Sequence, residues 1–341
     1  MKHILLLPAL YAAPLLAQHS PYIEAVDEYV PAPGQFVNVM PEYEDGDDAQ
    51  TMAAKCTEYL AQNRGYTITL GAWGGYVTFH FDHPIVNVAQ AYDLYIKGNA
   101  IQGSSEAGIV MVSRDDNQNG KPDDAWYELA GSADTDSSNV VYDYAVTYTH
   151  PGEPGDVAWV DNAGRQGCVS HNNYHPQQYY PQWLPSSMTY SGTLLPANAQ
   201  DISGNGSFWT LHALRQGYVD NLPNTDTIGN SFDIGWAVDA VTREPVQLET
   251  IDFVRVYTAL NQQAGWLGET STEVSGAMDL HPDASTADIA SIGQDDVMRP
   301  SYDLWGRRTR GERNTGNTEG SKSGKNRKQI TIQNHQIIIA L

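Results

Sequence analysis

Strand-type periodicity, repeated along the chain, is the feature that most constrains the fold of this sequence. In residues 66–81, β-branched or aromatic residues alternate with small or polar ones, and a glycine cluster at 71–75 divides this segment into two predicted strands. Only residues 48–62 show helical spacing. Further strand-type runs lie at residues 92–96, 108–113, 140–148, 208–211 and 251–257. The pattern predicts an all-β protein, an antiparallel jelly-roll-like β-sandwich with long loops and one short helix.

The two ends of the chain differ in composition from its middle. Residues 1–17 combine a basic start with an apolar run, which is typical of a cleaved secretory signal peptide and too short to span a membrane. Since no cysteine follows the apolar run, we expect a secreted or cell-surface protein with no lipoprotein anchor and no transmembrane segment. We assign residues 18–276 to the β-sandwich domain, 277–300 to an acidic linker and 301–341 to a basic tail.

Acidic residues dominate the chain and argue against one class of partner. The formal net charge is −22, and the tail from residue 307 holds 8 Lys or Arg against 2 Asp or Glu, so the body is more acidic still. Nucleic-acid-binding proteins need a basic stripe to neutralise phosphates, so we predict no nucleic-acid partner for the body. The two cysteines, Cys56 and Cys168, could form a disulfide in an export compartment, and their spacing favours neither the paired nor the free state.

Residues 115–123 have the spacing of a calcium-binding loop. Oxygen-bearing side chains occupy alternate positions before Gly120, as in loops that surround a hard cation with roughly 6 to 8 oxygens. Pro122 disfavours a helix, so we expect calcium as the cofactor of a loop without flanking helices. The alternative is an Asx-rich surface turn that binds no ion. The predicted ligands are Asp115, Asn117, Asn119, the Lys121 carbonyl and Asp123, with Glu128 as a further carboxylate beyond Trp126, which stands where a bidentate Glu is usual.

Aromatic side chains are dense and suggest a binding face. The chain holds 20 Tyr and 8 Trp, with a cluster in and near residues 174–183. Flat rings with a polar edge stack on a sugar ring or a corrin face while their OH and NH groups form hydrogen bonds. The alternative is that these rings fill the core of the sandwich. The predicted ligand-binding residues are Trp159, Tyr174, Tyr179, Tyr180 and Trp183.

Motifs of the familiar catalytic classes are missing from the sequence. It has no G-x-S-x-G elbow, no H-E-x-x-H zinc motif and no cysteine nucleophile with an obvious partner, so we predict no catalytic residues. His171 and His175 have the spacing of a helical metal site, but Pro176 disfavours a helix there. Paired carboxylates for glycoside hydrolysis stay open, because acidic residues are numerous; the candidates with aromatic or apolar neighbours are Glu128, Asp220, Asp233 and Asp239.

Several short segments carry a family resemblance. They are residues 31–38 (PAPGQFVN), 70–77 (LGAWGGYV), 81–87 (FDHPIVN), 108–115 (GIVMVSRD), 126–132 (WYELAGS) and 265–269 (GWLGE). Across about residues 24–280 the chain resembles a family of Bacteroidetes cell-surface proteins of poorly defined function. Residues 302–308 (YDLWGRR) also resemble the start of the C-terminal sorting regions of exported proteins in that group, although this chain ends in an apolar run. The resemblance implies a capture or accessory role beside an outer-membrane uptake complex for glycans or corrinoids, rather than catalysis.

These features together predict a secreted or cell-surface, calcium-stabilised protein that captures an extracellular glycan. A corrinoid-binding accessory of an outer-membrane uptake system is the second interpretation, and a glycoside hydrolase or a purely structural surface protein also remains open. The interpretations differ in what they require of the fold. A glycan binder requires exposed rings without a deep carboxylate pair, a hydrolase requires two facing carboxylates with one raised pKa, and a structural protein requires neither.

Overall fold

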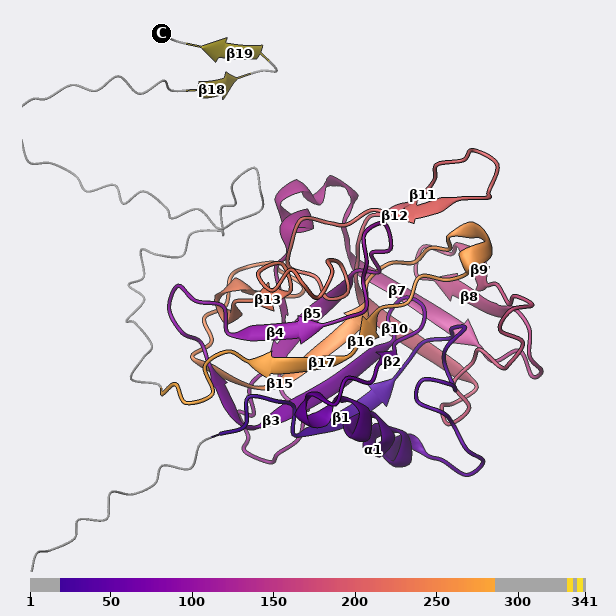
Figure 1. Ribbon diagram of the computed structural model, residues 1–341, viewed down its shortest axis with the longest axis horizontal. Coiled ribbons are helices and arrows are strands. Elements are labelled where there is room, and N and C mark those ends of the chain that lie inside the picture. Colours follow the sequence, from indigo (N-terminus) through magenta and orange to yellow (C-terminus); the bar gives the residue numbers. More distant parts are fainter. Residues whose placement is uncertain (1–18, 286–329, 334–335, 340–341) are drawn as a thin grey trace, which may run out of the picture.

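The computed structural model describes residues 19–285, 330–333 and 336–339, which Figure 1 shows in colour. The predicted signal peptide at 1–17, most of the predicted linker and the sorting-like segment at 302–308 lie outside the described residues. In the tail, β18 (Ile330–Gln333) pairs antiparallel with β19 (Gln336–Ile339). Within the described part of the chain, no helix has the length and apolar character that crossing a membrane requires.

A six-stranded antiparallel sheet forms the centre of the protein (Figure 1). Its order is β1 (Ala25–Val30), β3 (Tyr76–Val86), β15 (Thr250–Thr258), β5 (Gly108–Ser113), β6 (Trp126–Leu129) and β14 (Ala237–Asp239). The helix α1 (Ala49–Leu60) packs beside β1 and begins after Asp48, whose side chain accepts a hydrogen bond from the Thr51 amide. Met52, Cys56 and Leu60 recur on one face of α1 and are buried in the core that this sheet supplies.

A second, four-stranded sheet packs its own aromatic core. Its order is β10 (Ser187–Leu194), β7 (Val141–Thr149), β8 (Val157–Asp161) and β9 (Gln166–Val169). Tyrosines from this sheet and from the loop before β10 surround the buried Trp73. Each buried hydroxyl needs a partner, and the Tyr148 hydroxyl donates a hydrogen bond to the Trp73 carbonyl at 3.0 Å. The second core therefore holds much of the aromatic content that the sequence displays.

Smaller strand pairs join distant parts of the chain. β4 (Leu94–Lys97) lies between β13 (Ser231–Phe232) and β17 (Gly276–Asp279), β2 (Ile68–Thr69) pairs with β16 (Glu273–Val274), and β11 (Ala199–Asp201) forms a hairpin with β12 (Trp209–Leu211). Because β17 continues to Asp279, the sheet extends past residue 276, where the sequence suggested that a linker begins. Four 3₁₀ turns complete the fold: η1 (Ala61–Asn63), η2 (Ser132–Asn139), η3 (Ile234–Trp236) and η4 (Gly265–Leu267).

The two ends of the main described segment lie side by side. Tyr22 forms a β-bridge with Met278, and the Asp279 amide donates a hydrogen bond to the Pro21 carbonyl at 2.8 Å. Figure 1 shows both ends at the lower left of the protein, whereas η4 and the β11–β12 hairpin lie at the upper right. The two chain ends are therefore paired at one end of the fold, and η4 and the β11–β12 hairpin lie at the opposite end.

The prediction of an all-β protein with one short helix is confirmed. Helix α1 falls inside the predicted 48–62, and strands occur in every predicted strand segment. The sheets are antiparallel, and the jelly-roll connectivity stays a prediction. Cys56 lies on the buried face of α1, Cys168 lies on β9 in the second sheet, and both thiols are free.

Candidate functional site

The predicted calcium loop connects β5 to β6 and brings four of its predicted ligands together. Both oxygens of the Asp115 carboxylate accept backbone hydrogen bonds, from the amides of Asn119 (3.1 Å) and Gly120 (2.8 Å). The Asp123 carboxylate accepts from the side-chain amides of Asn117 at 3.0 Å and Asn119 at 3.0 Å. These bonds, that from Asn117 above all, lower the pKa of Asp123. The loop is thus a compact turn held by hydrogen bonds among these side chains and to its own backbone amides.

Two other predicted ligands have different surroundings. The Lys121 carbonyl accepts the Asp123 amide at 2.9 Å within the loop. Glu128 is not part of the loop, which corrects the prediction for this residue. It lies on β6, is 2% exposed, and binds Arg243, the Tyr257 hydroxyl and the Thr193 hydroxyl.

Most of the predicted ligand-binding aromatics belong to the core, as the alternative interpretation holds. Tyr179 and Tyr180 are 0% and 1% exposed, so neither ring can stack on a ligand. Trp183 stacks between Tyr29 and Tyr43 at ring distances of 5.6 and 6.0 Å. The prediction of a shared binding face is therefore wrong for the buried Tyr179 and Tyr180, whereas Trp183 is half-buried and its role in binding stays a prediction.

Trp159 and Tyr174 differ from the others in the cluster. The Trp159 ring covers Gly167 on the neighbouring strand, where an added Cβ would lie 2.3 Å from the ring. That glycine is required by the close approach of the ring, which indicates a packing role for Trp159. Tyr174 is 78% exposed and lines a pocket. Of the five predicted aromatic residues, Tyr174 alone is among the residues that line this pocket.

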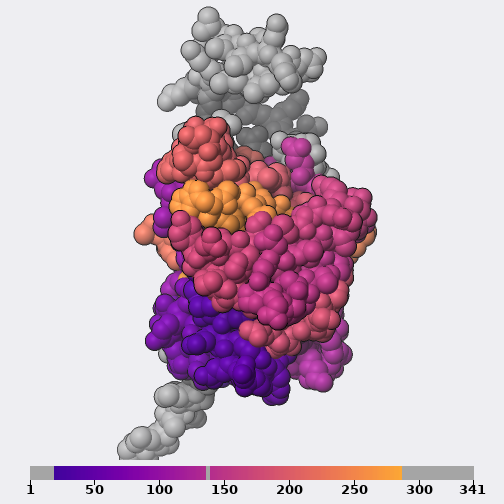
Figure 2. All heavy atoms as spheres, turned by 90° about the vertical axis from the view of Figure 1, so that its right-hand side faces the viewer, coloured from indigo at the N-terminus to yellow at the C-terminus, as the bar shows by residue number. Residues whose placement is uncertain are grey.

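The pocket has a volume of about 480 Å³ and is built from four separate segments of the chain. They are residues 35–40, 99–106, 172–175 and 264–273, and Leu211 of β12 completes the lining. Figure 2 shows the orange segment around η4 exposed between the β11–β12 hairpin above it and the pink segments of the second sheet below it. Loops that are far apart in the sequence thus converge on one cavity.

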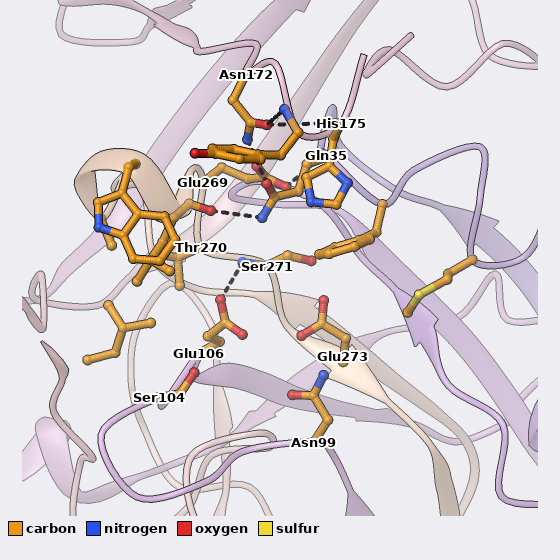
Figure 3. Close-up of a pocket in the computed structure, with 17 residues that line it drawn as sticks. Gln35, Asn99, Ser104, Glu106, Asn172, His175, Glu269, Thr270, Ser271 and Glu273 are labelled. Atoms are coloured by element: carbon orange, nitrogen blue, oxygen red, sulfur yellow. Dashed lines mark hydrogen bonds between the residues drawn. The ribbon is translucent and has the colours of Figure 1, made fainter. Parts of the chain in front are cut away.

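Three carboxyl groups meet at the floor of the pocket. One oxygen from each of Glu106, Asp220 and Glu273 lies within 4.8 Å of the others, and we call these residues the carboxylate cluster. Figure 3 shows Glu106 and Glu273 facing each other above Asn99. Asp220 lies beneath them and accepts three backbone hydrogen bonds, from the amides of Asn99 (2.6 Å), Ala100 (2.7 Å) and Glu273 (2.9 Å).

Burial disfavours ionisation of the carboxylate cluster. It raises the pKa of Glu106 to about 8 and that of Asp220 to about 6, and it raises the pKa of Glu273 well above its usual value. The neighbouring carboxylates add to this effect at Glu106 and Glu273 because like charges disfavour ionisation. Without a cation, the cluster therefore retains protons at neutral pH.

A fourth carboxyl group, Glu269, lines the same pocket. Its Oε1 accepts the Gln35 amide at 2.7 Å, whereas its Oε2 has no hydrogen-bond partner although the residue is only 4% exposed. Burial raises the pKa of Glu269 to about 8. Gln35 also binds the Leu267 carbonyl and the Asn172 side chain, so it connects the walls of the pocket.

Aromatic rings form the rim of the pocket. Trp266 on η4 is 55% exposed, and its Nε1 donates to the Ser207 carbonyl at 3.3 Å, which ties η4 to the β11–β12 hairpin. Phe36 meets the ring of His175 edge to face at 4.7 Å. The pocket thus combines exposed rings at its mouth with carboxyl and amide groups at its floor.

Sequence reasoning missed most residues of this pocket. Of the four carboxylates singled out, only Asp220 belongs to the carboxylate cluster, while Asp233 caps η3 and Asp239 caps a turn through the Thr242 amide. Trp266 and Glu269 stand in a segment noted only for its resemblance, and Glu106 and Glu273 carry no local motif. Carboxylate pairs were expected only among residues with aromatic or apolar neighbours, and this criterion selected none of Glu106, Glu269 and Glu273.

Histidines do not form the helical metal site that their spacing allowed. His175 lines the pocket, and His171 Nε2 lies 3.2 Å from the Gln177 carbonyl. Among the described residues, two groups of side chains have the proximity to hold a metal ion, the carboxylate cluster and the group of His19, Asp82 and His83. In the second group both ring nitrogens of His83 are already engaged, by Asp82 and Asp279.

No known protein family and no curated protein matches the sequence. Function must therefore be argued from the pocket and the loop themselves.

Proposed function

We propose that the protein is a secreted or cell-surface binding protein that captures an extracellular glycan in the pocket beside η4. One observation carries the proposal: the exposed rings of Trp266 and Tyr174 stand at the mouth of a cavity whose floor consists of carboxyl and amide groups. The apolar faces of a sugar stack on aromatic rings, and its hydroxyls need hydrogen-bond partners. Glu106, Glu273 and Asn99 supply such partners at the floor.

Substitution of the rim residues tests this proposal. We expect Trp266→Ala or Tyr174→Ala to weaken glycan binding about tenfold or more, because each removes a stacking surface. Tyr66→Ala is the matched control, since Tyr66 is 59% exposed and lies outside the pocket lining. Binding would be measured by calorimetry after a screen of glycans and a corrinoid. Equal affinity in all three variants would contradict the proposal, and a corrinoid as the sole ligand would favour the second interpretation.

Glycoside hydrolysis is the second candidate, and the facing pair of Glu106 and Glu273 favours it. Retaining glycosidases place two carboxyl groups about 5–5.5 Å apart and keep one of them protonated by a raised pKa. The two groups face each other at a somewhat shorter separation, within 4.8 Å, and the pKa of each is raised, so a hydrolase would need one of the two to ionise when substrate binds. Release of reducing ends that is lost in Glu106→Gln and in Glu273→Gln would favour hydrolysis over capture alone.

We also propose that calcium stabilises the loop of residues 115–123. An ion bound only by the folded state raises stability by about 2.7 kcal/mol when its concentration is 100 times the dissociation constant. We expect calcium to raise the melting temperature of the chelator-stripped protein, and Asp115→Ala to reduce this rise. Asp116→Ala is the control, because Asp116 pairs with Arg114 on the outside of the loop. An identical calcium response in both variants would show that the loop is an ordinary turn.

A further inference from the structure

We propose that the carboxylate cluster of Glu106, Asp220 and Glu273 binds a divalent cation, calcium by preference, at the floor of the pocket. This site is separate from the loop of residues 115–123, and it does not depend on which ligand the pocket captures. Each ligand residue comes from a different part of the chain. The site therefore exists only in the folded protein.

The spacing of the cluster matches one shared ion. Calcium binds oxygens at 2.3–2.6 Å, so two oxygens on the same ion lie at most about 4.6–5.2 Å apart. One oxygen from each of the three carboxyl groups lies within 4.8 Å of the others. The backbone amides that hold Asp220 fix its carboxylate in place before any ion arrives. An ion can therefore contact all three groups without rearrangement of the backbone.

An unsatisfied buried oxygen points independently to a missing ligand. Glu269 Oε2 has no partner, although Glu269 is 4% exposed and lines the same cavity. An unpaired buried oxygen is costly, and native proteins usually satisfy such atoms. A hydrated cation at the cluster would bring water molecules that donate hydrogen bonds to this oxygen. Glu269 and Glu106 line the same pocket.

The protein supplies no basic partner that would let the carboxylate cluster ionise. Glu106 and Glu273 of the cluster line the pocket together with Glu269, and no Lys or Arg is among the described residues that line it. Elsewhere in the fold, a buried carboxylate such as Glu128 is paired with an arginine. A divalent cation would supply the corresponding positive charge at the pocket floor.

The donor atoms indicate a hard cation. Besides the carboxylates, Figure 3 shows Asn99, Ser104 and Ser271 beside the cluster, so that oxygens are the predominant donors. Calcium and magnesium prefer such donors, whereas zinc and copper prefer nitrogen and sulfur. Glu106 and Asp220 lie in irregular segments and Glu273 begins β16, and calcium accepts such an irregular arrangement of ligands more readily than magnesium does.

Calorimetric titration of the whole protein with calcium tests the proposal. We expect Asp115→Ala, which removes the loop site, to retain one calcium ion. Adding Glu106→Gln and Glu273→Gln to that variant should weaken the remaining site about 100-fold or more, because two of three charged ligands are lost. Glu58→Gln on the exposed face of α1 is the matched control and should leave binding unchanged. Circular dichroism and thermal melting check that every variant is folded.

Three results would overturn the proposal. A folded Asp115→Ala protein that binds no calcium would show that the cluster is not an ion site. Retention of full affinity after the two Glu→Gln changes would show that the ion binds elsewhere. Tighter binding of magnesium than of calcium would overturn the assignment of the ion. If the double Gln change prevents folding, the single Glu106→Gln variant serves instead, since Glu106 is only part of the cluster and its side chain is partly exposed.

Discussion

Replacement of Arg243 by methionine is expected to lower the free energy of unfolding by about 3–5 kcal/mol. The Arg243 guanidinium binds the carboxylate of Glu128, which is 2% exposed, and it also binds Asp134 at 2.8 Å. Methionine keeps the length of the side chain but leaves the buried Glu128 without its positive partner. Urea unfolding at pH 7 would measure the loss.

A second substitution distinguishes the buried charge from lost packing. Glu128→Gln in the Arg243→Met background should recover much of the stability, because an uncharged amide is cheaper to bury than an unpaired carboxylate. Arg114→Met is the surface control: its side chain is 45% exposed in its pair with Asp116, so a change below about 1 kcal/mol is expected. A loss of similar size in both arginine variants would contradict the argument.

Replacement of Glu269 by glutamine is expected to stabilise the protein at alkaline pH, by about 2–5 kcal/mol at pH 9. Burial raises the folded-state pKa of Glu269 to about 8, above an unfolded value of about 4.3. The protonated carboxyl of Glu269 makes its full contribution to the free energy of unfolding below pH 4. This contribution is lost as pH rises through 8. Glutamine can keep an acceptor for the Gln35 amide without ever ionising.

The pH dependence of this gain is the decisive readout. Unfolding free energies of wild type and Glu269→Gln, measured in chelator at pH 5 and pH 9, should differ little at pH 5 and clearly at pH 9. Glu153→Gln is the control, because Glu153 is an exposed glutamate outside the pocket. If Glu269→Gln raised the free energy of unfolding equally at pH 5 and pH 9, the shape of the glutamine side chain, rather than the loss of the glutamate charge, would be responsible.

Local structure was predictable because it depends on neighbours in the sequence. The helical spacing of Met52, Cys56 and Leu60 is the same feature that buries them, so the sequence specified α1 to within a few residues. Strands were predictable for the same reason. Their partners were not, because the pairing of β2 with β16 joins residues more than 200 positions apart, and no periodicity encodes that choice.

The two candidate sites differ in the same way, since one is contiguous in the sequence and the other is assembled from distant residues. The loop of residues 115–123 is contiguous, so the convergence of its side chains could be inferred from spacing alone. The carboxylate cluster depends on three residues that only the tertiary fold brings together. The aromatic cluster misled for a related reason: Tyr179 and Tyr180 have the composition of a binding face, but a second sheet covers them. Composition shows which residue types are present without showing which surface they share.

The bridge between Tyr22 and Met278 has a consequence for how the domain would be displayed. Both connections to the rest of the chain leave from one end of the fold, while η4 and the β11–β12 hairpin occupy the opposite end (Figure 1). A tether joined to either terminus would hold the domain in nearly the same orientation. The segments η4 and β11–β12 would then lie on the side away from whatever the tether is attached to, and a bulky ligand could reach the exposed Trp266 there without obstruction from that attachment.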